Sequence, residues 1–163
     1  MIRVINNDDI EAITSIYNHY INNTVVSFEE ELVSIDKMSR RVAQVQALNY
    51  PWLVAEENKK IGGYAYADLW HTRSAYKHTV LVTIYLDPGF TGKGWGLKIY
   101  KTLFDNLKAC EVHTVIAGIS LPNPSSVTLH EKMGLKKVAH FSEVGYKFGQ
   151  WVDVVYWQGQ LTQ

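Results

Sequence analysis

The sequence predicts an α+β fold in which a mixed sheet carries helices, and three observations lead to this prediction. The 163 residues fit one domain, residues 1–163, which is long enough to bury about two-thirds of its unfolded surface. Apolar and β-branched runs typical of strands alternate with runs of helical spacing, in the order β-α-α-β-β-β-α-β-α-β-β. No internal repeat or low-complexity linker divides the chain.

In the first half of the chain, helical spacing changes to strand patterns at Pro51. A polar stretch from Asn7 offers a helix cap, after which Ile10, Ile13 and Ile16 recur at helical spacing. Two adjacent glycines at 62–63 predict a β-bulge. The expected strands are 2–5, 52–56 and 61–69, and the expected helices are about 8–21 and 34–48.

The second half begins with a β-branched and nearly all-apolar run at 79–86, which is typical of a central strand. A glycine-rich turn then opens a helix with Tyr100 and Phe104 on its apolar face. Gly134 ends the next helix. The expected strands are 79–86, 112–119, 136–146 and 151–158, and the expected helices are 97–110 and 122–133.

The composition excludes several classes of protein. Lys and Arg number 16 and so do Asp and Glu, and this balance argues against binding nucleic acid or an anionic membrane through a basic field. Cys110 is the one cysteine, which rules out a disulfide framework and a cysteine-rich zinc site. No long apolar run or leader pattern is visible, so we expect a cytoplasmic protein.

The clearest chemistry lies where a strand, a glycine-rich turn and a helix follow one another. Gly92, Gly94 and Gly96 let backbone N–H groups approach a ligand, and the helix adds its positive N-terminal end. Such a turn suits a pyrophosphate, with Lys93 as an added cation. The P-loop and dinucleotide-binding patterns both fail, because the glycines that they require elsewhere are absent. A turn without any ligand is the alternative.

With this turn at 91–96, the chain resembles the Gcn5-related N-acetyltransferases (the GNAT superfamily), which carry R/Q-x-x-G-x-G/A there. It resembles most closely the phosphinothricin acetyltransferase branch, whose members acetylate amino-acid analogues. The resemblance covers nearly the whole chain in register. The stretches that carry it are 16–21 (IYNHYI), 51–56 (PWLVAE), 63–67 (GYAYA), 73–76 (RSAY), 121–123 (LPN), 129–131 (LHE) and 145–154 (GYKFGQWVDV).

This resemblance implies a fold, a reaction and a set of contacts. The fold is the GNAT acyltransferase fold, a mixed and mostly antiparallel sheet flanked by about four helices. The reaction is direct attack of the primary amine of a small amino-acid-like acceptor on acetyl-CoA, in a homodimer and without a metal. The residues implied to hold acetyl-CoA are Ile84, Tyr85, Leu86 and Asn123 along the pantetheine, and Gly92, Lys93, Gly94, Trp95, Gly96 and Leu97 around the pyrophosphate.

Two positions depart from the family pattern. Thr91 replaces the Arg or Gln that usually begins the turn motif, although the turn amides can still contact phosphate. Leu81 replaces the Glu of the branch's T-V-E-x-T/S-V-Y-V segment, which is taken to deprotonate the amine, and leucine cannot accept a proton. Three alternatives follow: the amine is deprotonated by another group or arrives neutral, the chain binds acyl-CoA with reduced or lost catalysis, or another class of amine is the acceptor.

His130 is the first candidate for a catalytic proton-transfer group. In this branch a histidine is common where other GNAT enzymes place a tyrosine as general acid, and a pKa near 7 suits that task. A packed helix histidine is the alternative. A zinc H-E-x-x-H motif is excluded, because Gly134 stands at its second histidine. His78 and Glu29 are weaker candidates for the base, against the simpler interpretation of solvated side chains.

The resemblance also implies a set of acceptor contacts. Phe28 and Glu29 belong to a loop that covers the substrate, and Leu81 faces the same site. Arg73 belongs to an R-x-A-Y segment with Tyr76, and its guanidinium is suited to pairing with a substrate carboxylate. A surface salt bridge is the alternative role for Arg73.

Overall fold

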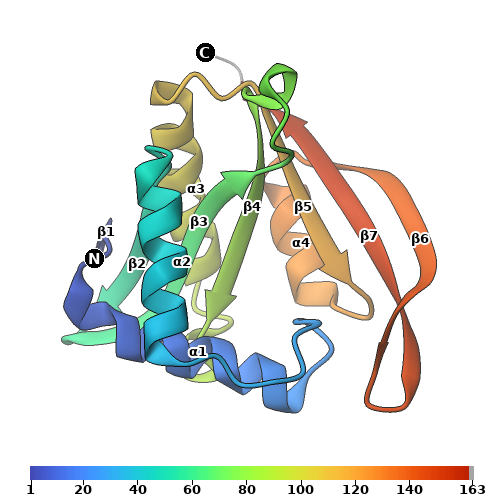
Figure 1. Cartoon of the computed structure of the whole chain (residues 1–163), viewed down its shortest axis with the longest axis horizontal. Coiled ribbons are helices and arrows are strands. Elements are labelled where there is room, and N and C mark those ends of the chain that lie inside the picture. Colours follow the sequence, from blue (N-terminus) through green and yellow to red (C-terminus); the bar gives the residue numbers. More distant parts are fainter. Residues whose placement is uncertain (162–163) are drawn as a thin grey trace.

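The structure, a computed structural model, describes residues 1–161 and is built on one seven-stranded sheet. The strand order across the sheet is β1-β2-β3-β4-β5-β7-β6 (Figure 1). The strands are β1 (Ile2–Val4), β2 (Trp52–Glu57), β3 (Lys60–Leu69), β4 (Thr79–Leu86), β5 (Thr114–Ser120), β6 (Lys136–Lys147) and β7 (Gln150–Gln160).

All neighbouring strands run antiparallel except β4 and β5, which are parallel. The predicted mixed sheet is therefore confirmed, and the apolar run at 79–86 is its middle strand β4. The predicted bulge is also present, because Ala55 pairs with Gly63 while Glu56 pairs with Ile61, which leaves Gly62 as the extra residue.

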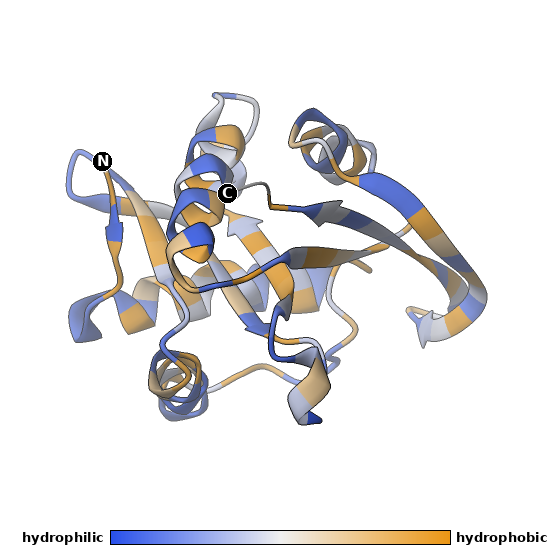
Figure 2. Ribbon diagram, turned by 90° about the horizontal axis from the view of Figure 1, so that it is seen from above, coloured by the Kyte–Doolittle hydropathy of each residue, from blue (hydrophilic) through white to orange (hydrophobic). Residues whose placement is uncertain are grey.

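Four α-helices cover the two faces of the sheet, in agreement with the expected number. They are α1 (Ile10–Asn23), α2 (Ile35–Ala47), α3 (Trp95–Ala109) and α4 (Pro124–Lys132). Figure 2, seen from above, shows helices on both sides of the sheet. None of the helices within residues 1–161 has the length and apolar character needed to cross a membrane.

Each face of the sheet has its own apolar core. Ile99, Leu103 and Leu107 of α3 pack on one face of the strands, where alanines such as Ala65 leave room for them. On the other face, α1 and α2 cover an aromatic group that includes Trp52 and Tyr64, whose rings stack 5.7 Å apart. The site described below lies between these two layers, so its walls are fixed from both sides.

Two helices begin two residues later than predicted. A 3₁₀ turn over Asn7–Asp9, capped by Asn6, precedes α1 and delays its start to Ile10. The helix expected from residue 122 begins at Pro124, since the side chain of Asn123 accepts the N–H of Ser126 as its cap.

The parallel pair at the centre of the sheet is short. β4 and β5 pair only from Thr79 to Leu81 and from Thr114 to Ile116. β4 then continues to Leu86 and β5 to Ser120 without pairing with each other, so the sheet opens between them. Along this opening β4 has no partner strand among the described residues, and the Tyr20 hydroxyl of α1 donates to the carbonyl oxygen of Leu86 at 2.5 Å. The other edge of β4 remains paired to β3.

Candidate functional site

Three connected hollows follow the opening between β4 and β5. The first, here the glycine-turn groove, measures about 680 Å³ and lies between β4, the 91–97 turn and the start of α4. The second, the lid cavity, measures about 760 Å³ and lies beneath the loop 24–33. The third, the junction cavity, measures about 100 Å³ and shares Val26 and Tyr85 with both of the others. One continuous site therefore runs through the opened sheet.

The glycine turn offers backbone donors to the groove. Gly92 and Gly94 have φ angles of 72° and 81°, in the left-handed region that favours glycine, and a Cβ at either position would point into open space. Within residues 1–161, no acceptor is found for the backbone N–H groups from Gly92 to Leu97. These donors sit at the N-terminal end of α3 and suit an anionic pyrophosphate.

The structure brings most of the sequence-predicted cofactor residues into this groove. Those in its lining are Ile84, Tyr85, Leu86, Gly92, Gly94, Gly96, Leu97 and Asn123. Lys93 and Trp95 are not among the lining residues, since the ammonium of Lys93 lies 5.9 Å from the ring of Phe90 and Trp95 is buried against the same ring. Lys132 of α4 lines the groove instead and is the cation that the sequence did not indicate.

A buried pair of proton-transfer groups, Tyr100 and His130, lines the junction cavity. Tyr100 of α3 is 0% exposed and His130 of α4 is 3% exposed. The Tyr100 hydroxyl lies 2.9 Å from His130 Nε2, and His130 Nδ1 lies 2.7 Å from the carbonyl oxygen of Ser126.

This geometry fixes the proton positions on the pair. A carbonyl oxygen only accepts, so His130 Nδ1 carries the hydrogen and Nε2 accepts from the Tyr100 hydroxyl. Burial lowers the pKa of His130, although the hydrogen bond to Ser126 opposes this, and burial raises the pKa of Tyr100. Both rings are therefore neutral, and a proton can pass between them. Tyr100 was predicted only as a core residue, because nothing in the sequence connects it with His130, 30 residues away.

The lid cavity has mostly apolar and aromatic walls. Leu81, Thr83 and Tyr85 of β4 form its floor, and Tyr156 of β7 and Phe28 of the 24–33 loop form its sides. Among the residues that the structure describes, Glu29 is the charged one in this lining. An apolar cavity with a few polar groups at one end is typical of a small-molecule site.

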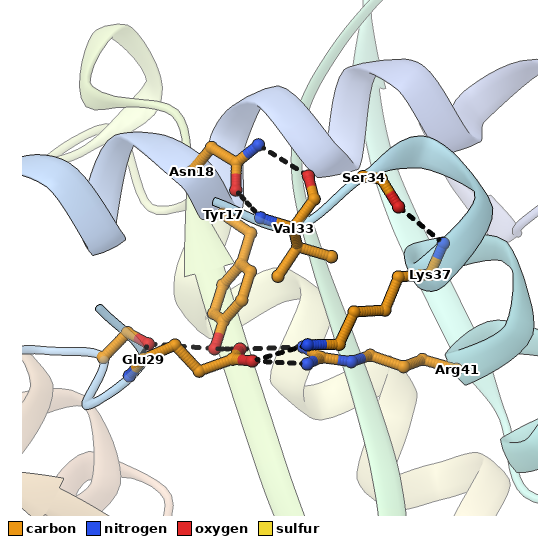
Figure 3. A network of polar contacts seen from close by, with 8 residues as sticks. Tyr17, Asn18, Glu29, Val33, Ser34, Lys37 and Arg41 are labelled. Atoms are coloured by element: carbon orange, nitrogen blue, oxygen red, sulfur yellow. Dashed lines mark hydrogen bonds and ion pairs between the residues drawn. The ribbon is translucent and has the colours of Figure 1, made fainter. Parts of the chain in front are cut away.

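Glu29 is held by three neighbours that fix the 24–33 loop over this cavity (Figure 3). Arg41 of α2 donates to both carboxylate oxygens, at 2.9 Å and 2.5 Å, and the Tyr17 hydroxyl of α1 donates to one of them. The ammonium of Lys37 lies 3.5 Å from Oε1 of Glu29. The hydrogen bonds from Arg41 are the largest cause that lowers the pKa of Glu29, to about 2. A carboxylate held in this way is a poor base, and its role here is to position the loop.

The other end of the 24–33 loop is fastened to β5 and to the β6–β7 hairpin. The Ser120 hydroxyl donates to the carbonyl oxygen of Val25 at 2.7 Å. The buried ammonium of Lys147 donates to the carbonyl oxygen of Ser27 at 2.6 Å. The Phe28 ring occupies the space that a Cβ on Gly145 would need, 2.4 Å from its position. The loop is therefore held from both ends.

The structure brings together three of the five acceptor residues expected from the sequence. Phe28, Glu29 and Leu81 line the lid cavity, whereas Arg73 and Tyr76 lie in the exposed loop 70–78 outside it. A contact of Arg73 and Tyr76 with an acceptor stays a prediction. His78, the weaker candidate base, also lies outside the cavity and contacts the carbonyl oxygen of Glu111 through Nδ1 at 2.8 Å.

Comparison with known proteins agrees with this architecture. The family model of the acetyltransferase (GNAT) domain matches residues 2–156. The L-methionine sulfoximine/L-methionine sulfone acetyltransferase of Salmonella typhimurium is 36% identical over 162 residues, which cover 99% of this chain and 95% of the relative. The phosphinothricin N-acetyltransferase of Alcaligenes faecalis is also 36% identical, over 99% of this chain and 82% of the relative.

A solved structure shares nearly the whole backbone. The acetyltransferase from Salmonella typhimurium, solved with its cofactor acetyl-CoA, superposes with a TM-score of 0.97 at 36% identity. The match covers 100% of this chain and 94% of that chain.

The Glu29 contacts lead to a pH-dependent prediction. Glu29→Gln removes the charge that Arg41 binds, so we expect the free energy of unfolding at pH 7 to fall by about 1–2 kcal/mol. The folded-state pKa of about 2 lies below the ordinary value of 4.5. The stabilisation is therefore complete above pH 4.5 and is lost as the pH falls toward 2. Urea unfolding of the wild type and of Glu29→Gln across this pH range measures the difference in free energy of unfolding, which should narrow as the pH falls. The exposed Glu31→Gln is the control. A difference that stays constant with pH contradicts the assignment.

Proposed function

The chain belongs to the GNAT family of acetyltransferases, and from this premise we propose that its acetyl acceptor is the primary amine of a small amino-acid analogue. It is an acetyl-CoA-dependent N-acetyltransferase, as are relatives that match nearly its whole length. The single observation that carries the proposal is the continuous site through the opened sheet, which joins an anion-binding groove to an apolar cavity.

The groove fits the acetyl-CoA that the reaction consumes. The free N–H groups of the 92–97 turn suit its pyrophosphate, and the unpaired edge of β4 along 84–86 suits the amides of its pantetheine arm. Asn123, whose Oδ1 caps α4, lines the same groove. We propose that the thioester lies at the junction cavity and the acceptor in the lid cavity.

The reaction forms a carbon–nitrogen bond and breaks a carbon–sulfur bond, with two protons to move. An ammonium acceptor gives up its first proton before it attacks the thioester carbon. We assign the second proton, lost from nitrogen after attack, to the Tyr100–His130 pair. It passes through the Tyr100 hydroxyl to His130 Nε2 and returns by the same hydroxyl to the leaving sulfur. Burial of the pair keeps bulk water from competing for this proton.

The first test is turnover. The substrates are acetyl-CoA and a panel of amino acids that includes L-methionine sulfone, L-methionine sulfoximine and phosphinothricin. We expect the release of free CoA to depend on the amine, as measured by thiol titration. We also expect mass spectrometry to detect the N-acetyl product. Polyamines, aminoglycosides and peptides with a free N-terminus serve as acceptors of other classes. Turnover of one of those alone contradicts the proposed acceptor. Tight acetyl-CoA binding without turnover of any amine contradicts the proposed function.

A second test addresses the buried pair. Tyr100→Phe removes the hydroxyl that links the cavity to His130, so we expect kcat to fall about 10- to 100-fold while KM for acetyl-CoA changes little. His130→Gln is expected to act in the same direction. Lys101→Gln, an exposed change on the same helix α3, is the control, and thermal unfolding of each variant separates catalytic loss from misfolding. Unchanged kcat in folded Tyr100→Phe contradicts the role.

We further propose that the enzyme is a homodimer that associates through the β6–β7 hairpin, whose strand β6 forms one edge of the sheet (Figure 1). The hairpin carries apolar side chains that are between 50% and 62% exposed, an unusual concentration for a free surface. These are Val138, Phe141, Val144, Tyr146, Phe148 and Trp151. Phe141 and Val144 also line the lid cavity, so a partner on this face would help to close it.

Mass measurement in solution tests the dimer. Light scattering of the wild type should give twice the chain mass of 18.6 kDa. Trp151→Glu places a charge in the apolar face and should shift the equilibrium to the monomer. Glu57→Gln, at the far side of the sheet, is the control. A wild type that is monomeric at micromolar concentration contradicts the proposal.

Two further expectations complete the proposal. We propose that residues 1–163 act as one domain, since a single sheet includes strands from Ile2 to Gln160. We also propose a cytoplasmic location, where acetyl-CoA is available to the enzyme.

A further inference from the structure

The missing acid at Leu81 has a neighbour that the sequence did not reveal. In the antiparallel pairing of β3 with β4, the residue directly opposite Leu81 is Asp68. Opposed residues of such a pair project from the same face of the sheet, with Cβ atoms about 5 Å apart. Since Leu81 lines the lid cavity, Asp68 lies on the cavity face of the sheet, one strand away.

The end of the cavity near Asp68 is shaped by the chain that follows it. Trp70, two residues further along, packs edge-on against Tyr156 with ring centroids 5.8 Å apart. Tyr156 belongs to β7 and lines the lid cavity, so this contact reaches across β4 and β5. Asp68 therefore lies on the cavity side of the sheet, two residues before a ring that contacts the cavity wall.

Asp68 is a carboxylate without a cation. Within residues 1–161 it forms no ion pair, and its one hydrogen bond is from the N–H of Leu69 to Oδ1, at 2.7 Å. It is half-buried, so water reaches it. Glu29, the carboxylate that lines the cavity, has both oxygens bound by Arg41 and is a poor base.

The titratable groups that face Asp68 are the hydroxyls of Tyr66 and Tyr50. Tyr66 precedes Asp68 on the same face of β3, and Tyr50 leads into the neighbouring strand β2. Burial is the main cause that raises the pKa of both tyrosines, and the charge of Asp68 contributes to each. The charges of Glu29 and Arg41 act on the pKa of Tyr66 in opposite directions, and the two groups form an ion pair with each other.

We propose that Asp68 is the proton acceptor for the acceptor's ammonium group, acting through one water molecule beside Leu81. The ammonium gives one proton to the water as the water gives one to the Asp68 carboxylate, which leaves the amine lone pair free to attack the thioester carbon. The second proton follows the Tyr100–His130 route described above, and bulk water later takes the proton from Asp68. This assignment rests on the proposed function.

The experiment compares amine turnover in four proteins: wild type, Asp68→Asn, Leu81→Glu and the double variant. Asp68→Asn should lower kcat/KM for the amine at least about tenfold at pH 7, with KM for acetyl-CoA unchanged. The loss of kcat/KM in Asp68→Asn relative to the wild type should become smaller as the pH rises toward the pKa of the amine, because more of the acceptor then arrives neutral. A merely structural role would not give this pH dependence.

The double variant gives the sharpest outcome. Leu81→Glu supplies a carboxylate from the opposite strand, so Asp68→Asn/Leu81→Glu should recover to within about threefold of the wild type. Leu81→Glu alone sets two carboxylates opposite each other, so it should lower Tm more in the wild-type background than in the Asp68→Asn background, where a neutral amide faces the new carboxylate. Asp105→Asn, an exposed change on α3, is the matched control.

The outcomes separate the possibilities. Full activity of Asp68→Asn at every pH overturns the assignment, as does a pH-independent loss that Leu81→Glu does not restore. If Asp68→Asn fails to fold, Asp68→Ser and Asp68→Glu make the same comparison, and only the second should stay active. A wild type that acetylates no amine contradicts the proposed function and this assignment with it, whereas an active wild type with an indifferent Asp68 contradicts this assignment alone.

Discussion

The early end of pairing between β4 and β5 is the constraint on which the site depends. Three residue pairs join the strands, after which each keeps only its outer neighbour. An unpaired strand edge inside a sheet leaves backbone donors and acceptors without partners, which is costly unless water or a ligand satisfies them. The glycine turn and the N-terminal end of α3 lie along the same opening. The unpaired strand edge of β4 and the unpaired N–H groups of the turn therefore face one groove. The fold thus prepares a surface for an extended and anionic ligand before any side chain contributes.

The 24–33 loop turns this opening into a cavity, and it is held by charge as well as by packing. Arg41 from α2 and Tyr17 from α1 bind Glu29 (Figure 3). Ser120 of β5 and Lys147 of β6 bind carbonyl groups of the same loop. Each of these contacts gives a charged or polar group a hydrogen-bond partner. Leaving such a group buried without a partner would cost more folding free energy. Because the partners come from four separate elements, the shape of the lid cavity depends on the correct packing of both layers.

The sequence predicts local features well and pairings poorly. The order of elements, the bulge at Gly62 and the glycine turn follow from short-range patterns, and the structure agrees with each of them. The partners of His130 and Glu29 come from other helices, and no spacing rule connects residue 130 with Tyr100 or residue 29 with Arg41. Asp68 and Leu81 are 13 positions apart, and the loop between them has no regular pattern that would fix how β3 pairs with β4. Only the observed register of the two strands shows that the two residues lie opposite each other.

The same register explains how the chain can keep a base for the acceptor amine although Leu81 replaces the usual Glu. A carboxylate acts at a site by its position relative to the substrate, and neighbouring strands offer positions of nearly equal height on one face of the sheet. In the lid cavity the charge of Glu29 is already balanced by Arg41, and the other walls are neutral. An unpaired carboxylate one strand from the floor therefore lies beside a cavity with little competing charge and mostly apolar walls, where it attracts an ammonium more strongly than in bulk water. Moving the acid from β4 to β3 leaves the thioester end of the site untouched, since Tyr100 and His130 reach the junction cavity from the helices behind the sheet.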